Sequence, residues 1–243
     1  MRTIRIFTDN GLETGQAARL DEGASHHLTK VLRLKPGQVV EIFNGDGYNY
    51  SATIETIGKK QVSVAVLDRQ PGVTASVPSF HIGQVISRGD RMDYMIQKAT
   101  ELGVTRISPL FSERCEVKLN EERQMKRVHH WRQIAIHASE QCGRCDIPEI
   151  TPVTSLAHWV TQREESRLLV LHYLEPQPLE ADPLPDSVAI LVGPEGGLSD
   201  AEIACAHSQG FATLGLGKRI LRTETAPVAA LSIFQWLWGD FQP

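Results

Sequence analysis

The residues best placed to do chemistry lie in two glycine-rich turns of the C-terminal third. The first turn, residues 193–197, reads GPEGG and follows the apolar run 189–192. The second, residues 214–226, reads LGLGKRILRTETA and begins at the end of an expected strand at 211–216. Turns that open helices leave backbone N–H groups unpaired, and glycine lets a ligand approach the backbone closely. Together the two turns predict a pocket for a polar small molecule.

Two common nucleotide-binding loops do not match these turns. A phosphate-binding loop needs Gly-x-x-x-x-Gly-Lys-Ser/Thr, and neither turn has that spacing. A dinucleotide fingerprint needs Gly-x-Gly-x-x-Gly, whereas residues 214–217 supply only a fragment of it before Lys218 and Arg219. We therefore expect neither a nucleoside triphosphatase loop nor a nicotinamide site.

The elements around the turns predict an α/β domain with a parallel sheet. Residues 80–86 and 104–110 read as buried strands that flank a helix at 91–102, which makes a β-α-β unit. Ser199 and Glu202 form a capping box, so a helix should begin directly after the first turn. Ligand sites in such folds lie at the carboxyl ends of strands. His172, at the end of an expected strand, should therefore lie near both turns.

The N-terminal part has a different pattern, which predicts a small β-barrel. Short alternating strands are expected at 2–7, 39–43, 50–57 and 61–67, with a short helix at 25–32 and a tight turn at 44–47. Residues 70–78 have the composition of a linker. We therefore divide the chain into a barrel at residues 1–72 and an α/β domain at residues 73–243.

Composition indicates an ordinary globular protein with a cytoplasmic location. The hydrophobic fraction is 41% and the formal net charge is −4. No apolar run approaches the roughly 20 residues of a membrane span, and the N-terminus lacks the apolar core of a signal peptide. The four cysteines suit a reducing compartment. Cys142 and Cys145 form a lone Cys-x-x-Cys without two further ligands, so we expect no metal.

Five pieces of the chain carry a resemblance to a known family. They are QVISRGDRMDYMIQKATELGV, PLFSERC, IAIHASEQCGR, LVGPEGGLS and LGKRILRTETA. These pieces resemble the bacterial small-subunit ribosomal RNA uracil-N3 methyltransferases, which are S-adenosylmethionine-dependent enzymes of the trefoil-knot (SPOUT) class. The resemblance covers nearly the whole chain, and the last two pieces are its most specific motifs. It implies an N-terminal PUA-like β-barrel and a C-terminal knotted α/β domain with a mostly parallel sheet.

The resemblance also implies a homodimer with each cofactor site near the subunit interface. The expected last helix agrees, because residues 226–238 are apolar nearly all round and such a helix is buried on more than one side. The alternative is a central core helix in a monomer.

By resemblance, S-adenosyl-L-methionine is the cofactor and its site is made by the ends of the expected strands and the two turns. The implied cofactor-binding residues are Leu171, His172, Gly193, Pro194, Glu195, Gly196, Gly197, Leu214, Gly215, Leu216, Ile220, Leu221, Thr223, Thr225 and Ala226. For the glycines, the alternative is a role in turn geometry alone.

The acceptor chemistry needs a base and a cation. Uracil N3 carries a proton and becomes a nucleophile only when that proton leaves. A positive group near O2 or O4 would stabilise the developing anion. We expect Arg222 to be that cation and either Glu224 or Glu195 to be the base. The alternatives are a helix N-terminal charge for Glu224 and a loop hydrogen bond for Glu195.

The expected partner is ribosomal RNA or the small ribosomal subunit, bound through phosphate contacts. The candidate RNA-binding residues are Arg2, Arg5 and Arg33 of the barrel and Arg88, Arg91 and Arg114 of the α/β domain. The alternative is ordinary surface ion pairing. Two other functions stay open: a ribose 2′-O-methyltransferase of the same class, and an RNA-binding assembly factor without catalysis.

Overall fold

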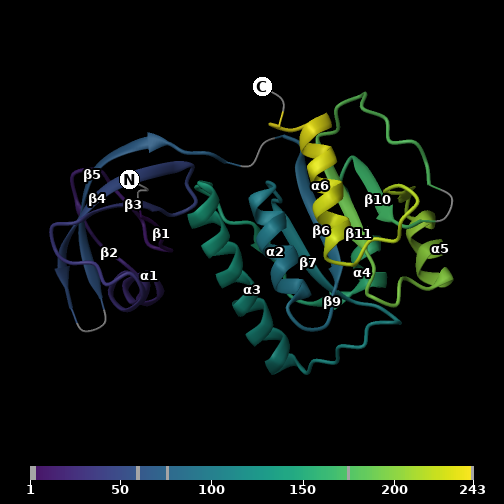
Figure 1. Ribbon diagram of the computed structural model, residues 1–243, viewed down its shortest axis with the longest axis horizontal. Coiled ribbons are helices and arrows are strands. Elements are labelled where there is room, and N and C mark those ends of the chain that lie inside the picture. Colours follow the sequence, from purple (N-terminus) through teal and green to yellow (C-terminus); the bar gives the residue numbers. More distant parts are fainter. Residues whose placement is uncertain (1–3, 59–60, 75–76, 174–175, 242–243) are drawn as a thin grey trace. The chain divides into compact units, whose positions relative to one another are not determined.

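The computed structural model describes residues 4–58, 61–74, 77–173 and 176–241 (Figure 1). The chain divides into two compact units. Unit 1 holds residues 1–74 and 139–147, and unit 2 holds residues 75–138 and 148–243. Residues 139–147, which the sequence-based division assigned to the second domain, thus belong with the first. No helix in the described part of the chain is long and apolar enough to cross a membrane.

Unit 1 is a five-stranded sheet around its own core. The sheet order is β1-β3-β4-β5-β2, with β1 parallel to β3 and the other neighbours antiparallel. The strands are β1 (Arg5–Phe7), β2 (Ala17–Arg19), β3 (Val39–Phe43), β4 (Tyr48–Ile57) and β5 (Val62–Pro71). Alternate residues of the strands, such as Ile42, Ile54 and Val64, meet in one buried cluster. This inward-facing core is the arrangement expected of a small barrel.

One strand and one helix of unit 1 differ from the sequence-based expectation. The helix expected at residue 25 begins earlier, as α1 (Glu22–His26), because the Asp21 carboxylate accepts a hydrogen bond from the Ala24 N–H. It continues as a short π-helix, η1 (His27–Val31). Strand β2 was missed because three largely exposed residues carry no periodic pattern.

Unit 2 confirms the predicted α/β class with a parallel sheet. The sheet order is β12-β10-β11-β6-β7-β8, every pair is parallel, and β9 pairs with β7. The strands are β6 (Ser79–Val85), β7 (Arg106–Phe111), β8 (Glu149–Ile150), β9 (Thr154–Ser155), β10 (Arg167–Leu171), β11 (Ser187–Val192) and β12 (Ala212–Leu214). The helices are α2 (Arg91–Glu101), α3 (Glu121–Cys142), α4 (Leu156–Thr161), α5 (Asp200–Ser208) and α6 (Thr225–Leu237), with residues 139–142 of α3 belonging to unit 1.

Helices cover both faces of this sheet, so its strands are buried and apolar. On one face, Trp159 of α4 packs against Gly83, where a Cβ atom would come within 2.7 Å of the indole ring. On the other face, Phe234 of α6 stacks on Phe80 of β6 at 5.9 Å between ring centroids. Figure 1 shows α6 and α2 crossing the sheet on that second face. The carboxyl ends of the central strands are left for the connecting loops.

Candidate active site

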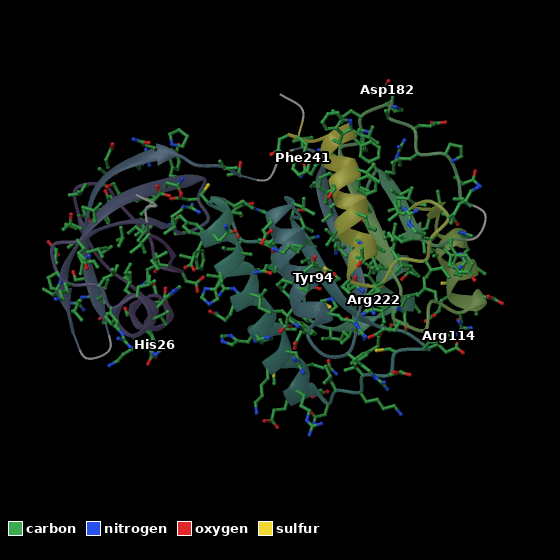
Figure 2. All side chains as sticks on the ribbon, in the orientation of Figure 1. His26, Tyr94, Arg114, Asp182, Arg222 and Phe241 are labelled. Carbon is green, nitrogen blue, oxygen red and sulfur yellow. The ribbon has the colours of Figure 1, made fainter. Side chains whose placement is uncertain are left out.

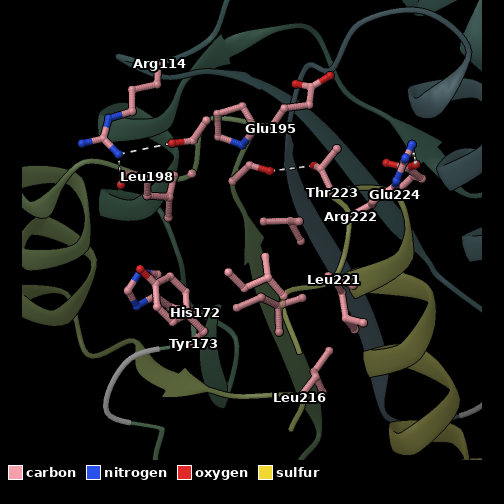
Figure 3. A pocket seen from close by; sticks show the side chains of 18 of the residues that line it. Arg114, His172, Tyr173, Glu195, Leu198, Leu216, Leu221, Arg222, Thr223 and Glu224 are labelled. Atoms are coloured by element: carbon pink, nitrogen blue, oxygen red, sulfur yellow. Dashed lines mark hydrogen bonds and ion pairs between the residues drawn. The ribbon is translucent and has the colours of Figure 1, made fainter. Parts of the chain in front are cut away.

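A cavity of about 640 Å³ lies at the carboxyl ends of β10, β11 and β12, within unit 2. Its walls are the three chain segments that leave these strands: residues 171–173, 192–200 and 214–226 (Figure 3). This volume is in the range of sites for small molecules. The parallel order β12-β10-β11 brings the three segments together although they are far apart in the sequence.

The sequence dictates the shape of the first turn. At Gly193 a Cβ atom would lie 3.0 Å from the Leu198 Cγ and 3.3 Å from the Leu198 N. Gly197 has φ of 71°, in the left-handed region that favours glycine. The predicted capping box is present, since Ser199 and Glu202 each bond to the other's backbone N–H at the start of α5. The turn is therefore fixed at both ends.

Thr223 joins the two turns by a hydrogen-bond chain. Its Oγ1 donates to the carbonyl of Gly193 at 2.7 Å and accepts from the Gln84 Nε2 at 2.9 Å. Figure 3 shows the first of these bonds as a dashed line between the turns. Gln84 is 1% exposed. In the sequence, Gln84 differs from its neighbours only as a polar residue inside an otherwise apolar strand, and no pattern there indicates what it contacts.

The cavity is lined by all but two of the residues predicted to bind the cofactor. Gly215 and Thr225 lie instead in a neighbouring groove of about 570 Å³ beside α6. The three predicted catalytic residues, Arg222, Glu224 and Glu195, all line the cavity. Sequence reasoning missed several other lining residues, namely Tyr173, Val192, Leu198, Asp200, Gly217 and Arg219. The position of these residues is now known, whereas their binding roles stay predictions.

The carboxylate of Glu195 is firmly held. Its Oε1 accepts the Arg88 backbone N–H at 3.0 Å and also contacts the Arg91 guanidinium. Burial alone would raise the pKa of Glu195, but these hydrogen bonds outweigh it and the pKa lies below its usual value. Glu195 is therefore a fixed anion in this conformation.

Glu224 has a different environment at the first turn of α6. Its side chain is 14% exposed, with Oε2 3.8 Å from the Arg91 Nε and Oε1 4.0 Å from the Arg222 Nη1. Within the described residues, Oε2 is buried and accepts no hydrogen bond. Arg222 itself is 76% exposed. A buried carboxylate oxygen with a free lone pair and an exposed guanidinium beside it can take a proton and face a developing anion.

Several predicted RNA-binding arginines make contacts with the protein itself. Arg91 lies between Glu195 and Glu224. Arg114 donates to the carbonyl oxygens of Gly196 and Leu198, at 3.2 Å each, so it braces the first turn. The Arg88 guanidinium pairs with Glu116 at the surface. These contacts argue that Arg91 and Arg114 shape the cavity.

The predicted RNA-binding arginines of unit 1 differ in their exposure and contacts. Arg5 is 11% exposed and donates to Glu41, to Asn49 and to three backbone carbonyls of residues 139–144. This placement argues against the predicted phosphate contact of Arg5. Arg33 is exposed and has φ of 54°. Arg2 lies outside the described residues.

The lone Cys-x-x-Cys segment places its two thiols in different surroundings. Cys142 is exposed, whereas Cys145 is buried and its thiol donates to the Val73 carbonyl at 3.2 Å. Burial raises the pKa of the Cys145 thiol. All four cysteines are free.

The chain is similar to known RNA methyltransferases in both sequence and structure. Residues 75–235 match the RNA methyltransferase domain family, and residues 20–67 match the RNA methyltransferase PUA domain family. A relative from Buchnera aphidicola, named ribosomal RNA small subunit methyltransferase E, is 36% identical over 98% of each chain. A methyltransferase from Legionella pneumophila, solved with its bound cofactor SAM, is 41% identical with a TM-score of 0.93 over 97% of this chain and 98% of that one. A ribosomal RNA small subunit methyltransferase E from Neisseria gonorrhoeae, solved with S-adenosyl methionine, is 35% identical with a TM-score of 0.91 over 99% of this chain and 100% of that one.

Proposed function

The chain belongs to the RNA methyltransferase family, and on this premise we propose that it methylates N3 of a uridine in small-subunit ribosomal RNA with S-adenosylmethionine. The observation that carries the proposal is the cavity at the carboxyl ends of β10, β11 and β12. It lies in a chain that aligns over almost its whole length with two solved relatives that hold this cofactor. The enzyme is an RNA methyltransferase, and its substrate is ribosomal RNA of the small subunit.

The cavity residues fit the cofactor. Leu171, Leu214, Leu216 and Leu221 provide apolar walls suited to an adenine ring. The 193–197 turn brings bare backbone to the cavity, since Gly193 packs so closely on Leu198 that an added Cβ atom would lie 3.0 Å from the Leu198 Cγ. When bound, the cofactor supplies an electrophilic methyl group on a sulfonium. The protein holds the two turns together through Thr223 and so sets where that methyl group points.

We assign the base to Glu224 in preference to Glu195. A base must accept a proton from uracil N3, which needs a free lone pair. Oε2 of Glu224 accepts no hydrogen bond from the described residues, whereas Glu195 already accepts from Arg88 and Arg91. Arg222, exposed at the rim, stabilises the negative charge that develops on the uracil oxygens. Glu195 holds Arg91 and Arg88 in place.

We propose that a second copy of the chain packs against the exposed side of α6. Ile233 and Trp236 are 40% and 57% exposed, although the opposite side of the helix is buried. The groove beside it is lined by apolar residues including Leu221, Ala229 and Leu237. An exposed apolar helix face of this kind is typical of a homodimer interface.

A C-terminal knot is also part of the proposal. After β12 at the sheet edge, the chain returns past β10 to α6, which packs on β11. The connection that follows β10 contacts both ends of this path. Gln177 N–H donates to the Thr213 carbonyl at 2.9 Å, and the Trp238 Nε1 donates to the Ala181 carbonyl at 2.8 Å. We propose that residues 215–224 thread through this connection.

The sequence-based division remains our proposal for the roles of the two parts. Residues 1–72 form a PUA-like barrel that binds RNA, in line with the family match at residues 20–67, and residues 73–243 carry the methyltransferase. Because its substrate is ribosomal RNA, we place the reaction in the cytoplasm.

The test is methyl transfer from labelled S-adenosylmethionine to small subunits and to naked ribosomal RNA from a strain that lacks this protein. Nucleoside mass spectrometry then identifies the product. We expect N3-methyluridine. A 2′-O-methylated nucleoside would instead establish the ribose methyltransferase. Calorimetry that shows no binding of S-adenosylmethionine, together with intact RNA binding, would leave only the assembly factor.

A further inference from the structure

The positive charge of unit 2 is distributed unevenly. The C-terminal residues 151–243 hold five Lys and Arg against eleven Asp and Glu, so the part that builds the cavity is acidic. Residues 118–132, by contrast, hold five Lys and Arg against two Glu. They form the approach to α3 and its first half. A polyanionic substrate therefore meets favourable charge at α3.

The cations of this segment are exposed and largely uncommitted. Among the described residues, the side chains of Lys118, Arg123 and Arg127 have no ion-pair or hydrogen-bond partner. Lys126 pairs with Glu122, but both side chains are about 70% exposed, and surface pairs of this kind contribute little to stability. A phosphate can replace Glu122 at little cost. Figure 2 shows nitrogen-tipped side chains projecting from the lower end of α3.

Helical spacing aligns these side chains. Arg123, Lys126 and Arg127 stand at i, i+3 and i+4, so they share one side of α3. Farther along the helix, Trp131 and Ala135 belong to the buried stripe of α3, which lies beside this side. The acidic neighbours are Glu121 and Glu122 in the first turn and Asp93 of α2, and Asp93 bonds to His130 and to the Trp131 Nε1. The Asp93 carboxylate is therefore already bonded to His130 and Trp131.

We propose that Lys118, Arg123, Lys126 and Arg127, the α3 basic face, bind the phosphate backbone of the RNA substrate. This assignment rests on the proposed function, and it supplies RNA contacts in place of Arg91 and Arg114, which brace the cavity. The face is within reach of the site. Arg114 lines the cavity and α3 begins seven residues later, at Glu121, so an extended chain places them at most about 25 Å apart.

The test compares two double variants of the full-length protein that remove the same charge. R123Q/R127Q neutralises the α3 basic face. K98Q/R106Q is the matched control, because Lys98 pairs with Glu101 and Arg106 pairs with Glu149. Binding to transcribed small-subunit ribosomal RNA is measured over a salt series, and S-adenosylmethionine binding is measured by calorimetry.

Each lost phosphate contact lowers the salt slope by about 0.7. We therefore expect R123Q/R127Q to weaken RNA binding by about 25-fold at 0.1 M salt and to lower the slope by about 1.4. Affinity for the cofactor should stay within twofold, as should RNA binding by the control. E122Q, which frees Lys126, should tighten RNA binding.

Two results would overturn the proposal. The first is equal RNA affinity and salt slope for R123Q/R127Q and wild type. The second is a loss seen with assembled subunits but absent with naked RNA, which would make the α3 basic face a contact for an acidic protein. Failure of the proposed function has a separate signature, since wild type would then lack cofactor binding or methyl transfer while its RNA binding is still measurable.

Discussion

Glu224 and Glu195 line one cavity, yet their surroundings suit them to different tasks. The Glu195 carboxylate is held by two hydrogen bonds that lower its pKa, which makes it a weak proton acceptor and a good anchor. The Glu224 Oε2 is buried and accepts no hydrogen bond from the described residues. At the scale of single residues, the division of labour therefore follows from which lone pairs are free.

This division predicts unequal effects of two isosteric substitutions. E224Q should lower the single-turnover rate of methyl transfer by about 10²- to 10⁴-fold, as loss of a general base does. E195Q should have a smaller effect on the rate, because its role is to position Arg91 and Arg88. The measurement uses saturating RNA and cofactor, with cofactor affinity checked by calorimetry. Near-normal turnover of E224Q would reject Glu224 as the base.

Arg222 is predicted to act on the transition state. R222A should reduce the single-turnover rate by about 10²- to 10³-fold, the usual loss when one charge-stabilising donor is removed. Its side chain is 76% exposed, so folding should be unaffected. R219A is a suitable control, since Arg219 also lines the cavity and carries the same charge. Equal losses in both variants would point to general RNA attraction instead.

At the scale of elements, the first turn makes a sharp test of shape. G193A places a Cβ atom 3.0 Å from the Leu198 Cγ, a contact tight enough that Leu198 and the turn must give by a few tenths of an ångström. At Gly196 the nearest atom to a new Cβ is the Arg114 Cβ at 3.5 Å, an ordinary contact. We expect G193A to weaken cofactor binding at least tenfold and G196A to change it little. Calorimetry on both variants decides, and equal affinities would show that the turn is not part of the cofactor site.

A buried hydrogen-bond network lies near the amino ends of β6 and β10, whereas the cavity lies at the carboxyl ends of the strands. The His81 Nδ1 lies 2.6 Å from the Glu165 Oε1, and the His81 Nε2 lies 2.8 Å from the Ser108 Oγ. Burial lowers the pKa of His81, only partly offset by Glu165. Burial would raise the pKa of Glu165, but hydrogen bonds and the charges of His81 and Arg163 bring it down to about 2.

These shifts predict acid sensitivity with a definite sign. Both pKa values are lower in the folded state, so the folded protein binds fewer protons and stability falls as pH drops. The His81 contribution is lost below its ordinary value of 6.5, and the Glu165 contribution between 4.5 and about 2. Urea unfolding from pH 7 to pH 3 should show E165Q flattening the lower part of this decline. E164Q, at the exposed neighbour, should leave it unchanged.

The sequence predicted where helices and strands lie better than it predicted their side-chain contacts and the order of the strands. Alternation and capping located β3, β6, β10 and α5, because each has a periodic or capped pattern of its own. Strands β8 and β9 were missed, since two residues carry no period. The side-chain partners of Arg5, Arg91 and Arg114 were also beyond reach, because sequence gives a charge but not what a long side chain meets. The order β12-β10-β11-β6 depends on crossovers that no local pattern encodes.

At the scale of the whole molecule, α6 has one side that the described residues cover and one that they leave exposed. Phe234 and Leu231 are buried, and Phe234 stacks on Phe80 and on Trp238. Ile233 and Trp236 stay exposed beside a groove that contains Gly215 and Thr225. A subunit docked there would contact the same 214–226 segment that lines the cavity. Dimerisation and cofactor binding would then stabilise each other.

This linkage makes W236S the most informative test of assembly. The indole is 57% exposed, so its loss should cost the isolated chain little. A central interface tryptophan contributes about 2–4 kcal/mol, so the dimer dissociation constant should rise by about 30- to 1,000-fold. M125S is the matched control, because Met125 is 68% exposed on α3. Sedimentation at micromolar concentration should show a dimer for wild type and M125S and a monomer for W236S.

If the dimer orders the 214–226 segment, the cofactor affinity of W236S must fall as the dimer dissociates and recover at high protein concentration. A wild-type monomer at micromolar concentration would reject both the dimer and its linkage to cofactor binding.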